Sequence, residues 1–399
     1  MRPTADVQVR RGRWAVAAMF TVNGFLVGSW AVQIPFLLQR HPITESTLGL
    51  LILLFGAGAV AAMSTTGRLL NRFGSRTVAL SFGMVACLAL SAVVLAPSLL
   101  LVCPALLLFG AGAGSMDVAM NANAVEVERR LGHAVMSSSH GFWSIGGFSG
   151  GVLAVPLLGW FGSSAHVMIA SGLALAVLLA AQPFVISEAR HPATGRPAYV
   201  RPKGWAIVVL GLMALASMVP EGAVIDWAAI YLASEHGAGL AQSSLGFALF
   251  AGAMAAMRFA GDAVRNRYGA VRVMRISAWL AAAGMLIGGL APVGWLVIAG
   301  FMVAGLGIAN MVPILFSASG NQPGLPAASG IALVTTMGYS GLLAAPSIIG
   351  FAGEYFGFRG VFVVLAFCLA LVALNAFRVG VADRVRVQAG AALPARSTG

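Results

Sequence analysis

Carboxylate and amide side chains inside long apolar runs are the residues of this sequence best placed to do chemistry. Asp117 and Asn121 are four residues apart in the run 98–125, so a helix would put both on one face. Glu221 lies within the run 205–233. An ionisable group at bilayer depth is costly and is usually paired or functional. We predict that Asp117 and Glu221 carry a proton or bind a substrate; for Asp117 the alternative is a structural carboxylate paired with a neighbour.

Other polar and aromatic residues could line a substrate cavity around these carboxylates. They are Asn23, Asn121, Asn310, His140, Gln33, Trp30 and Trp227. A histidine can transfer protons near neutral pH, but a hydrogen-bonded structural histidine is the more common case. Tryptophan rings stack on sugar or drug rings, but they more often anchor a helix at the membrane interface.

Arg258 and Asp262 are four residues apart near one end of an apolar run. This spacing lets them pair directly on one helix face. We expect a structural ion pair here, with a state-dependent gate as the alternative.

Composition shows what kind of scaffold must position these residues. Of the 399 residues, 59% are hydrophobic and only 9% are charged, whereas soluble domains carry about 25% charge. A soluble protein is therefore excluded. The three cysteines lie in apolar runs without metal-ligand spacing, and no phosphate-binding loop, zinc-protease motif or nucleophile elbow occurs. We expect no enzyme, no metal and no cofactor, so any transport must use an ion gradient or the gradient of the substrate itself.

Twelve apolar runs are long enough to cross a bilayer as helices, and they are continuous rather than alternating, which excludes a β-barrel. They lie near 14–38, 48–70, 77–96, 98–125, 136–160, 165–187, 205–233, 241–263, 271–291, 293–316, 327–351 and 359–379. The fold class is thus an all-α polytopic membrane protein. We expect an N-terminal six-helix half over 1–187, a linker over 188–203, and a C-terminal half with a tail over 204–399.

Basic residues set the expected orientation. If both termini are cytoplasmic, 21 of the 24 lysines and arginines lie on the cytoplasmic side, and only Arg40, Arg258 and Arg359 do not. This bias follows the positive-inside rule. The net charge of +12 therefore points to anionic lipid headgroups rather than nucleic acid as its partner. We expect a monomer in a bacterial inner membrane.

The two halves repeat at an offset of about 190 to 198 residues. Ser46-Thr47-Leu48-Gly49 matches Ser243-Ser244-Leu245-Gly246, Trp30-Ala31 matches Trp227-Ala228, and the GVLAVP of 151–156 matches the GLLAAP of 341–346. The same register puts Glu221 at the position of Asn23, and Asn310 at that of Asp117. Repeats of this kind place a central binding site between the halves.

The turn after the second run carries a glycine and arginine motif, Gly67-Arg68-Leu69-Leu70-Asn71-Arg72-Phe73-Gly74-Ser75-Arg76. With the twelve runs and two halves, it resembles the major facilitator superfamily (MFS), although Asn71 stands where the family usually has an acid. A second copy has Gly261-Asp262 and then Arg267, Gly269 and Arg272. We expect the cytoplasmic gate and loop motif to comprise Gly67, Asn71, Arg72, Gly74, Arg76, Arg258, Asp262, Arg267 and Gly269.

The fourth run, with Gly110, Gly112, Gly114 and Asp117, resembles the fucose-permease-like branch of that superfamily. Members of that branch are largely proton-coupled sugar importers. The resemblance implies alternating access and proton-coupled uptake of a sugar or another small polar molecule. The alternatives are proton-driven efflux of a drug-like or hydrophobic compound, and a non-transporting membrane sensor or scaffold.

Overall fold

A computed structural model describes residues 5–41, 43, 45–187 and 205–383, and these residues are almost entirely helical. The first part of the chain forms α1 (Ala5–Arg40), α2 (Glu45–Phe73), α3 (Ser75–Leu95), α4 (Leu99–Leu131), α5 (Met136–Ala181) and the short η1 (Gln182–Phe184). The second part forms α6 (Ala206–His236), α7 (Leu240–Tyr268), α8 (Ala270–Leu290), α9 (Gly294–Ile308), α10 (Met311–Gly320), α11 (Ala327–Phe356), α12 (Phe358–Leu374) and η2 (Ala376–Asp383). The expected linker 188–203 lies outside the described residues.

The expected polytopic all-α fold is confirmed. Ten helices among the described residues are long and apolar enough to cross a membrane, or eleven if α12 and the bent η2 count as one span. At 1.5 Å per residue, the 46 residues of α5 would extend about 69 Å, against a hydrocarbon core of about 30 Å. Its backbone breaks at Gly162, where φ is 77°, a conformation that glycine adopts without a Cβ clash. The element α5 therefore consists of two helices that meet at Gly162, one for each of the two predicted runs 136–160 and 165–187.

One predicted run contains two helices. The run 293–316 contains α9 and α10, with a break at Asn310. Pro313 lies in the first turn of α10, where the N–H that proline lacks would have no helical partner in any case. The break places a polar residue at a helix end in the middle of an apolar run.

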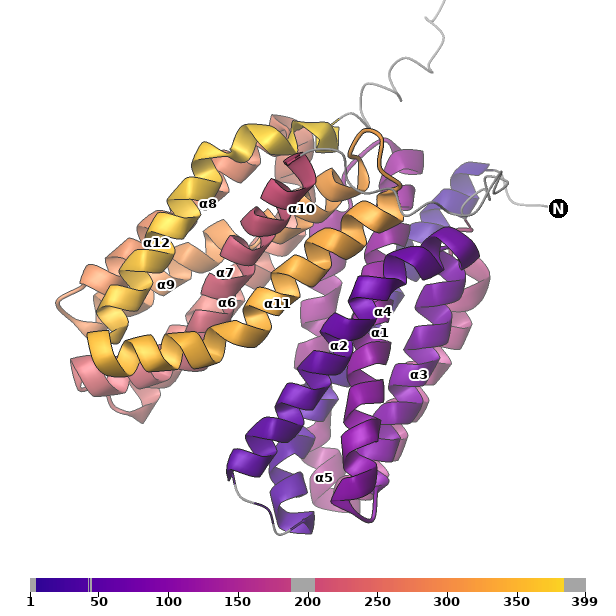
Figure 1. Cartoon of the computed structure of the whole chain (residues 1–399), viewed down its shortest axis with the longest axis horizontal. Coiled ribbons are helices and arrows are strands. Elements are labelled where there is room, and N and C mark those ends of the chain that lie inside the picture. The colour runs from indigo at the N-terminus through magenta and orange to yellow at the C-terminus, as the bar shows by residue number, and fades with distance from the viewer. Residues whose placement is uncertain (1–4, 42, 44, 188–204, 384–399) are drawn as a thin grey trace, which may run out of the picture. The chain divides into compact units, whose positions relative to one another are not determined.

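Contacts between residues divide the chain into two compact units, within each of which the long helices run side by side (Figure 1). Unit 1 contains α1 to α3, most of α4, α5 from Ser139, η1 and the segment Pro326–Thr336. Unit 2 contains the segment Glu128–Ser138, α6 to α10, α11 from Met337, α12 and η2. The start of the fifth helix of each repeat therefore packs within the unit built mainly from the other repeat.

Glycines bring α1 and α5 of unit 1 close together. A Cβ atom on Gly24 would collide with the backbone carbonyl of Trp143, and one on Gly28 with the backbone of Gly147. Small residues allow this kind of close helix approach in membranes. The approach sets Asn23, next to Gly24, beside the tryptophan of α5.

Candidate functional site

A chain of polar side chains links α4 and α5 inside unit 1. Asp117 and Asn121 are both buried. The Asn121 amide nitrogen donates to the backbone oxygen of Asp117 at 2.9 Å and lies 3.4 Å from its carboxylate oxygen Oδ1. On its other side, the Asn121 amide oxygen lies 3.2 Å from Nε2 of His140. Three of the residues predicted as site residues are therefore connected through one amide.

A second polar contact in unit 1 joins α1, α4 and α5. Asn23, which is buried, donates through Nδ2 to the backbone oxygen of Ala113 at 3.0 Å. Its amide oxygen accepts a hydrogen bond from the indole Nε1 of Trp143 at 2.9 Å. Sequence reasoning missed Trp143. The available signal was that a tryptophan N–H in a membrane helix needs an acceptor.

Glu221 of α6 forms an ion pair with Arg258 of α7 within unit 2. Its Oε1 lies 3.2 Å from Nη2 of Arg258, and the side chains are 19% and 7% exposed respectively. The sequence predicted instead that Arg258 pairs with Asp262, and this prediction was wrong. Spacing on one helix shows which residues can meet, but it does not show that a carboxylate on α6 faces the same arginine.

The Asp262 carboxylate accepts hydrogen bonds from the start of α5. Its two oxygens accept the backbone N–H groups of Ser137 and Ser138 at 2.9 and 2.8 Å. The first N–H groups of a helix have no partner within the helix, and the helix dipole favours a negative charge there. Asp262 therefore caps the start of α5.

Asn310 occupies the break between α9 and α10 and is fully buried. Its side chain lies against Gly261 of α7, where an added Cβ atom would overlap the amide oxygen of Asn310. Gly261, the glycine of the second motif copy, thus makes room for the polar side chain of Asn310.

The first copy of the loop motif contacts the start of α11 within unit 1. The amide nitrogen of Asn71 donates to Oγ of Ser329 at 3.0 Å, and a Cβ on Gly67 would lie 3.1 Å from Cβ of Ala332. Gly74 has a φ of 80° at the α2–α3 turn. Arg72 lies over the ring of Phe73, and Arg76 donates to Ser187.

The second copy makes a similar contact in unit 2. The amide oxygen of Asn266 accepts the backbone N–H of Ala134 at 2.9 Å, just before α5. Gly269 has a φ of 81° at the α7–α8 turn, and Arg267 lies over the ring of Tyr268. Asn266 was missed from the sequence, although it holds the same position before the motif arginine as Asn71.

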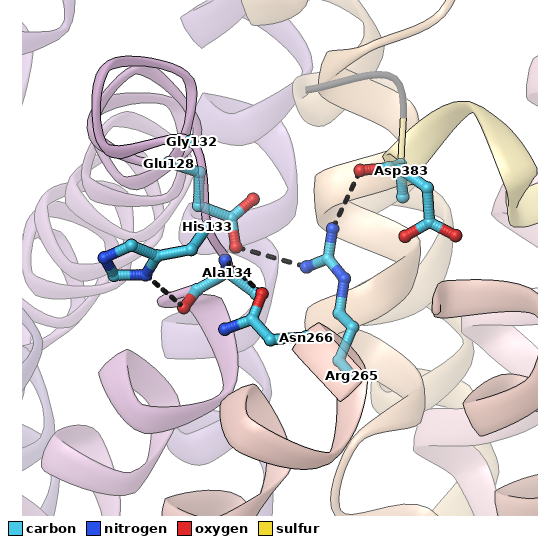
Figure 2. Close-up of a pocket in the computed structure, with 8 residues that line it drawn as sticks. Glu128, Gly132, His133, Ala134, Arg265, Asn266 and Asp383 are labelled. Atoms are coloured by element: carbon cyan, nitrogen blue, oxygen red, sulfur yellow. Dashed lines mark hydrogen bonds and ion pairs between the residues drawn. The ribbon is translucent and has the colours of Figure 1, made fainter. Parts of the chain in front are cut away.

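An ionic cluster around Glu128 lies beside this contact (Figure 2). Glu128 is 1% exposed and lies 3.1 Å from Nη1 of Arg265. It also accepts the Ser317 hydroxyl at 2.6 Å and the N–H groups of Val135 and Met136 at 3.0 and 3.1 Å. Arg265 donates further to Ser317 and to the carbonyl of Ala382. This set of bonds connects α4, α5, α7, α10 and η2.

No family model matches the sequence, but whole-length relatives exist. An uncharacterised MFS-type transporter of Yersinia pestis is 38% identical over 359 residues, which cover 90% of this chain and 93% of that protein. The chain belongs to the major facilitator superfamily. It is therefore a multi-pass membrane transporter for a small-molecule substrate and not an enzyme.

Solved MFS structures share the fold of this transporter at low sequence identity. The Escherichia coli fucose:proton symporter FucP superimposes with a TM-score of 0.73 at 15% identity, over 92% of this chain and 98% of that one. The human organic anion transporter MFSD10 gives 0.74 at 16% identity, over 92% and 99%. Two structures with different substrates match equally well, so the fold alone does not identify the substrate.

Three further predicted cavity residues of this MFS transporter have partners within their own units. Gln33 donates to the backbone oxygen of Ser163, and its Nε2 lies 2.6 Å from Nδ1 of His166. Trp30 packs edge-on against Phe109. Trp227 packs against Phe358. Their predicted roles in a substrate cavity stay predictions.

Proposed function

We propose that this MFS transporter moves a small polar solute, such as a sugar, by proton-coupled alternating access. The observation that carries the proposal is the connection of Asp117, Asn121 and His140 inside unit 1. Asp117 is the proton carrier, because it is a buried carboxylate within an apolar span. Asn121 couples it to the imidazole of His140, a group suited to proton exchange near neutral pH.

We assign solute recognition to the amides of Asn23 and Asn310 and the indole of Trp143. Asn23 and Trp143 offer a hydrogen-bonded platform, and Asn310 is the amide at the repeat position of Asp117. The Glu221–Arg258 pair supplies opposite charges that a polar solute can separate and contact individually. FucP is described as a fucose:proton symporter, which agrees with this chemistry.

Orientation follows from the basic residues. We place both termini in the cytoplasm of a bacterial cell, with the inner membrane as the location. The α2–α3 turn with Arg72 and Arg76, and the α7–α8 turn with Arg267, then lie on the cytoplasmic side, as the positive-inside rule requires.

Solute-driven proton movement in proteoliposomes tests the proposal. L-Fucose, D-xylose, amino acids and organic acids are added in turn to vesicles at zero membrane potential; organic acids are included because MFSD10 is described as an organic anion transporter. A symporter alkalinises the outer medium when its solute is added. Solute uptake without any pH change would contradict proton coupling, and acidification of the medium would indicate exchange or export instead.

A further inference from the structure

An apolar groove lies on unit 2 between α6, α11 and α12, with a cavity volume of about 630 Å³. Its lining is almost entirely aliphatic, and the single side-chain hydroxyl comes from Ser340. The groove does not include Glu221, Arg258 or Asn310, so it is separate from the polar residues assigned to transport.

Small residues create the groove. α11 packs closely on α6, because a Cβ on Gly338 or Gly341 would lie 2.5 Å from Met218 or Leu215. Ala344 and Ala352 of α11 and Gly360 in the first turn of α12 also line the groove. The space that larger side chains would fill between the two helices is therefore open.

The groove opens on an exposed apolar surface. Its rim residues Ile348, Phe356 and Val364 are 65%, 78% and 60% exposed. The exposed face of α12 continues along the helix with Phe367, Leu371 and Leu374. Water gains no hydrogen bonds in an apolar cavity, so the aliphatic lining suits an alkyl chain.

A basic residue directly precedes one of the lining residues of the groove. Arg359 precedes Gly360 at the start of α12 and its side chain is 48% exposed. Its Nε lies 3.6 Å from the Glu235 carboxylate, and a guanidinium has further N–H donors on its two terminal nitrogens. Tyr355 and Phe356, both exposed, lie at the same turn. Aromatic and basic side chains together are typical of the headgroup level of a membrane.

We propose that this groove binds one phospholipid of the adjoining leaflet, with an acyl chain along Ala344 and Ala352 and the phosphate at Arg359. Both parts of the molecule have a counterpart: the aliphatic lining matches the chain, and the arginine matches the anionic phosphate. An apolar transport substrate would need the lining but not the arginine. The inference does not depend on the proposed proton coupling.

Native mass spectrometry of the full chain, purified in detergent and titrated with phosphatidylglycerol, measures this binding. Arg359→Gln is expected to weaken binding about fivefold, since a basic residue near the surface contributes about 1 kcal/mol to anionic lipid binding. The double variant Ala344→Leu/Ala352→Leu fills the groove and is expected to abolish specific lipid retention.

Matched controls separate this site from general lipid affinity. Arg40→Gln removes another exposed arginine, and Ala283→Leu enlarges an exposed alanine of α8 away from the groove; both should retain wild-type binding. Thermal unfolding without added lipid checks that all variants are folded. If the groove-filling variant retains the lipid like Ala283→Leu, the site is wrong. If filling removes binding but Arg359→Gln changes nothing, the phosphate does not bind at Arg359 and the proposal fails.

Discussion

At the scale of single residues, Glu128 shows how this protein tolerates a buried charge. It has a cationic partner, a hydroxyl donor and two backbone N–H donors, so its oxygens are well compensated. Arg265 in turn depends on Glu128, because its other bonds go to the neutral oxygens of Ser317 and Ala382. Removing one member of a buried pair leaves the other charge without compensation.

Glu128→Gln is therefore expected to lower the free energy of unfolding by about 3 kcal/mol, measured by denaturant unfolding in detergent. Adding Arg265→Gln should recover part of this loss, because the double variant has no uncompensated charge. Glu354→Gln, at an exposed carboxylate, is the control and should be close to neutral. Equal effects of Glu128→Gln and Glu354→Gln would show that the cluster contributes nothing to stability.

Trp143 is a second residue whose role is measurable. Trp143→Phe keeps an aromatic ring but leaves the buried amide oxygen of Asn23 without this donor, at a cost of about 1–2 kcal/mol. Trp160 is 75% exposed, so Trp160→Phe should be nearly neutral. Thermal unfolding of both variants measures the two effects. A larger loss at position 160 than at 143 would contradict the assigned hydrogen bond.

His236 gives stability a predicted pH dependence. It lies at the end of α6, beyond the apolar span Ala206–Ala228. Burial, and next the charge of Arg359, lower the pKa of His236, while Glu235 opposes this shift. The unfolded chain has a histidine pKa of about 6.5 and binds more protons than the folded protein below that value. Stability from this group is therefore present above about pH 6.5 and is lost as the pH falls through the lowered pKa.

His236→Gln should accordingly flatten the acid side of a melting-temperature profile between about pH 5 and pH 8. The exposed His133, changed to glutamine, serves as the control and should leave the profile as in the wild type. An unchanged acid slope in His236→Gln would rule out this histidine as the source.

At the scale of elements, the sequence predicts spans better than it predicts their ends. Composition and run length are enough to mark apolar helices, because the bilayer imposes both. The break between the two helices of α5 depends on the backbone angle of one glycine, Gly162, and many other glycines in apolar runs do not turn the chain. The Glu221–Arg258 pair depends on how α6 packs against α7, which spacing along a single helix does not encode.

The contact between α7 and the α9–α10 break can be tested through one glycine. Alanine normally favours a helix over glycine by about 1 kcal/mol, so Gly252→Ala, with open space around it in α7, should be neutral or stabilising. Gly261→Ala in the same helix should instead destabilise by about 2 kcal/mol, because the new methyl group overlaps the Asn310 amide. Gly261→Ala/Asn310→Ala should recover much of that loss in denaturant unfolding. A stabilising Gly261→Ala would refute this packing.

At the scale of the whole molecule, the two repeats share the asparagine contact of the loop motif but differ in the charged contacts around it. Asn71 and Asn266 each hold the region where a fifth helix begins, one within each unit. Around the second copy, Asp262 and Arg265 add charged contacts, the latter with Glu128, whereas the first copy has Gly67 and Leu70 at the positions of Asp262 and Arg265. The internal repeat was visible in the sequence because glycines and arginines recur in order. The unequal charge contacts required knowledge of which residues face each other.

Proton coupling through Asp117 is the central claim, and comparing two transport modes of Asp117→Asn in proteoliposomes tests it most directly. Once a solute is identified, the variant should keep solute counterflow, which needs binding and alternating access, and should lose accumulation driven by a pH gradient. Asp226→Asn, at an exposed carboxylate of α6, should keep both. Full pH-driven accumulation by Asp117→Asn, at the wild-type level, would contradict the claim.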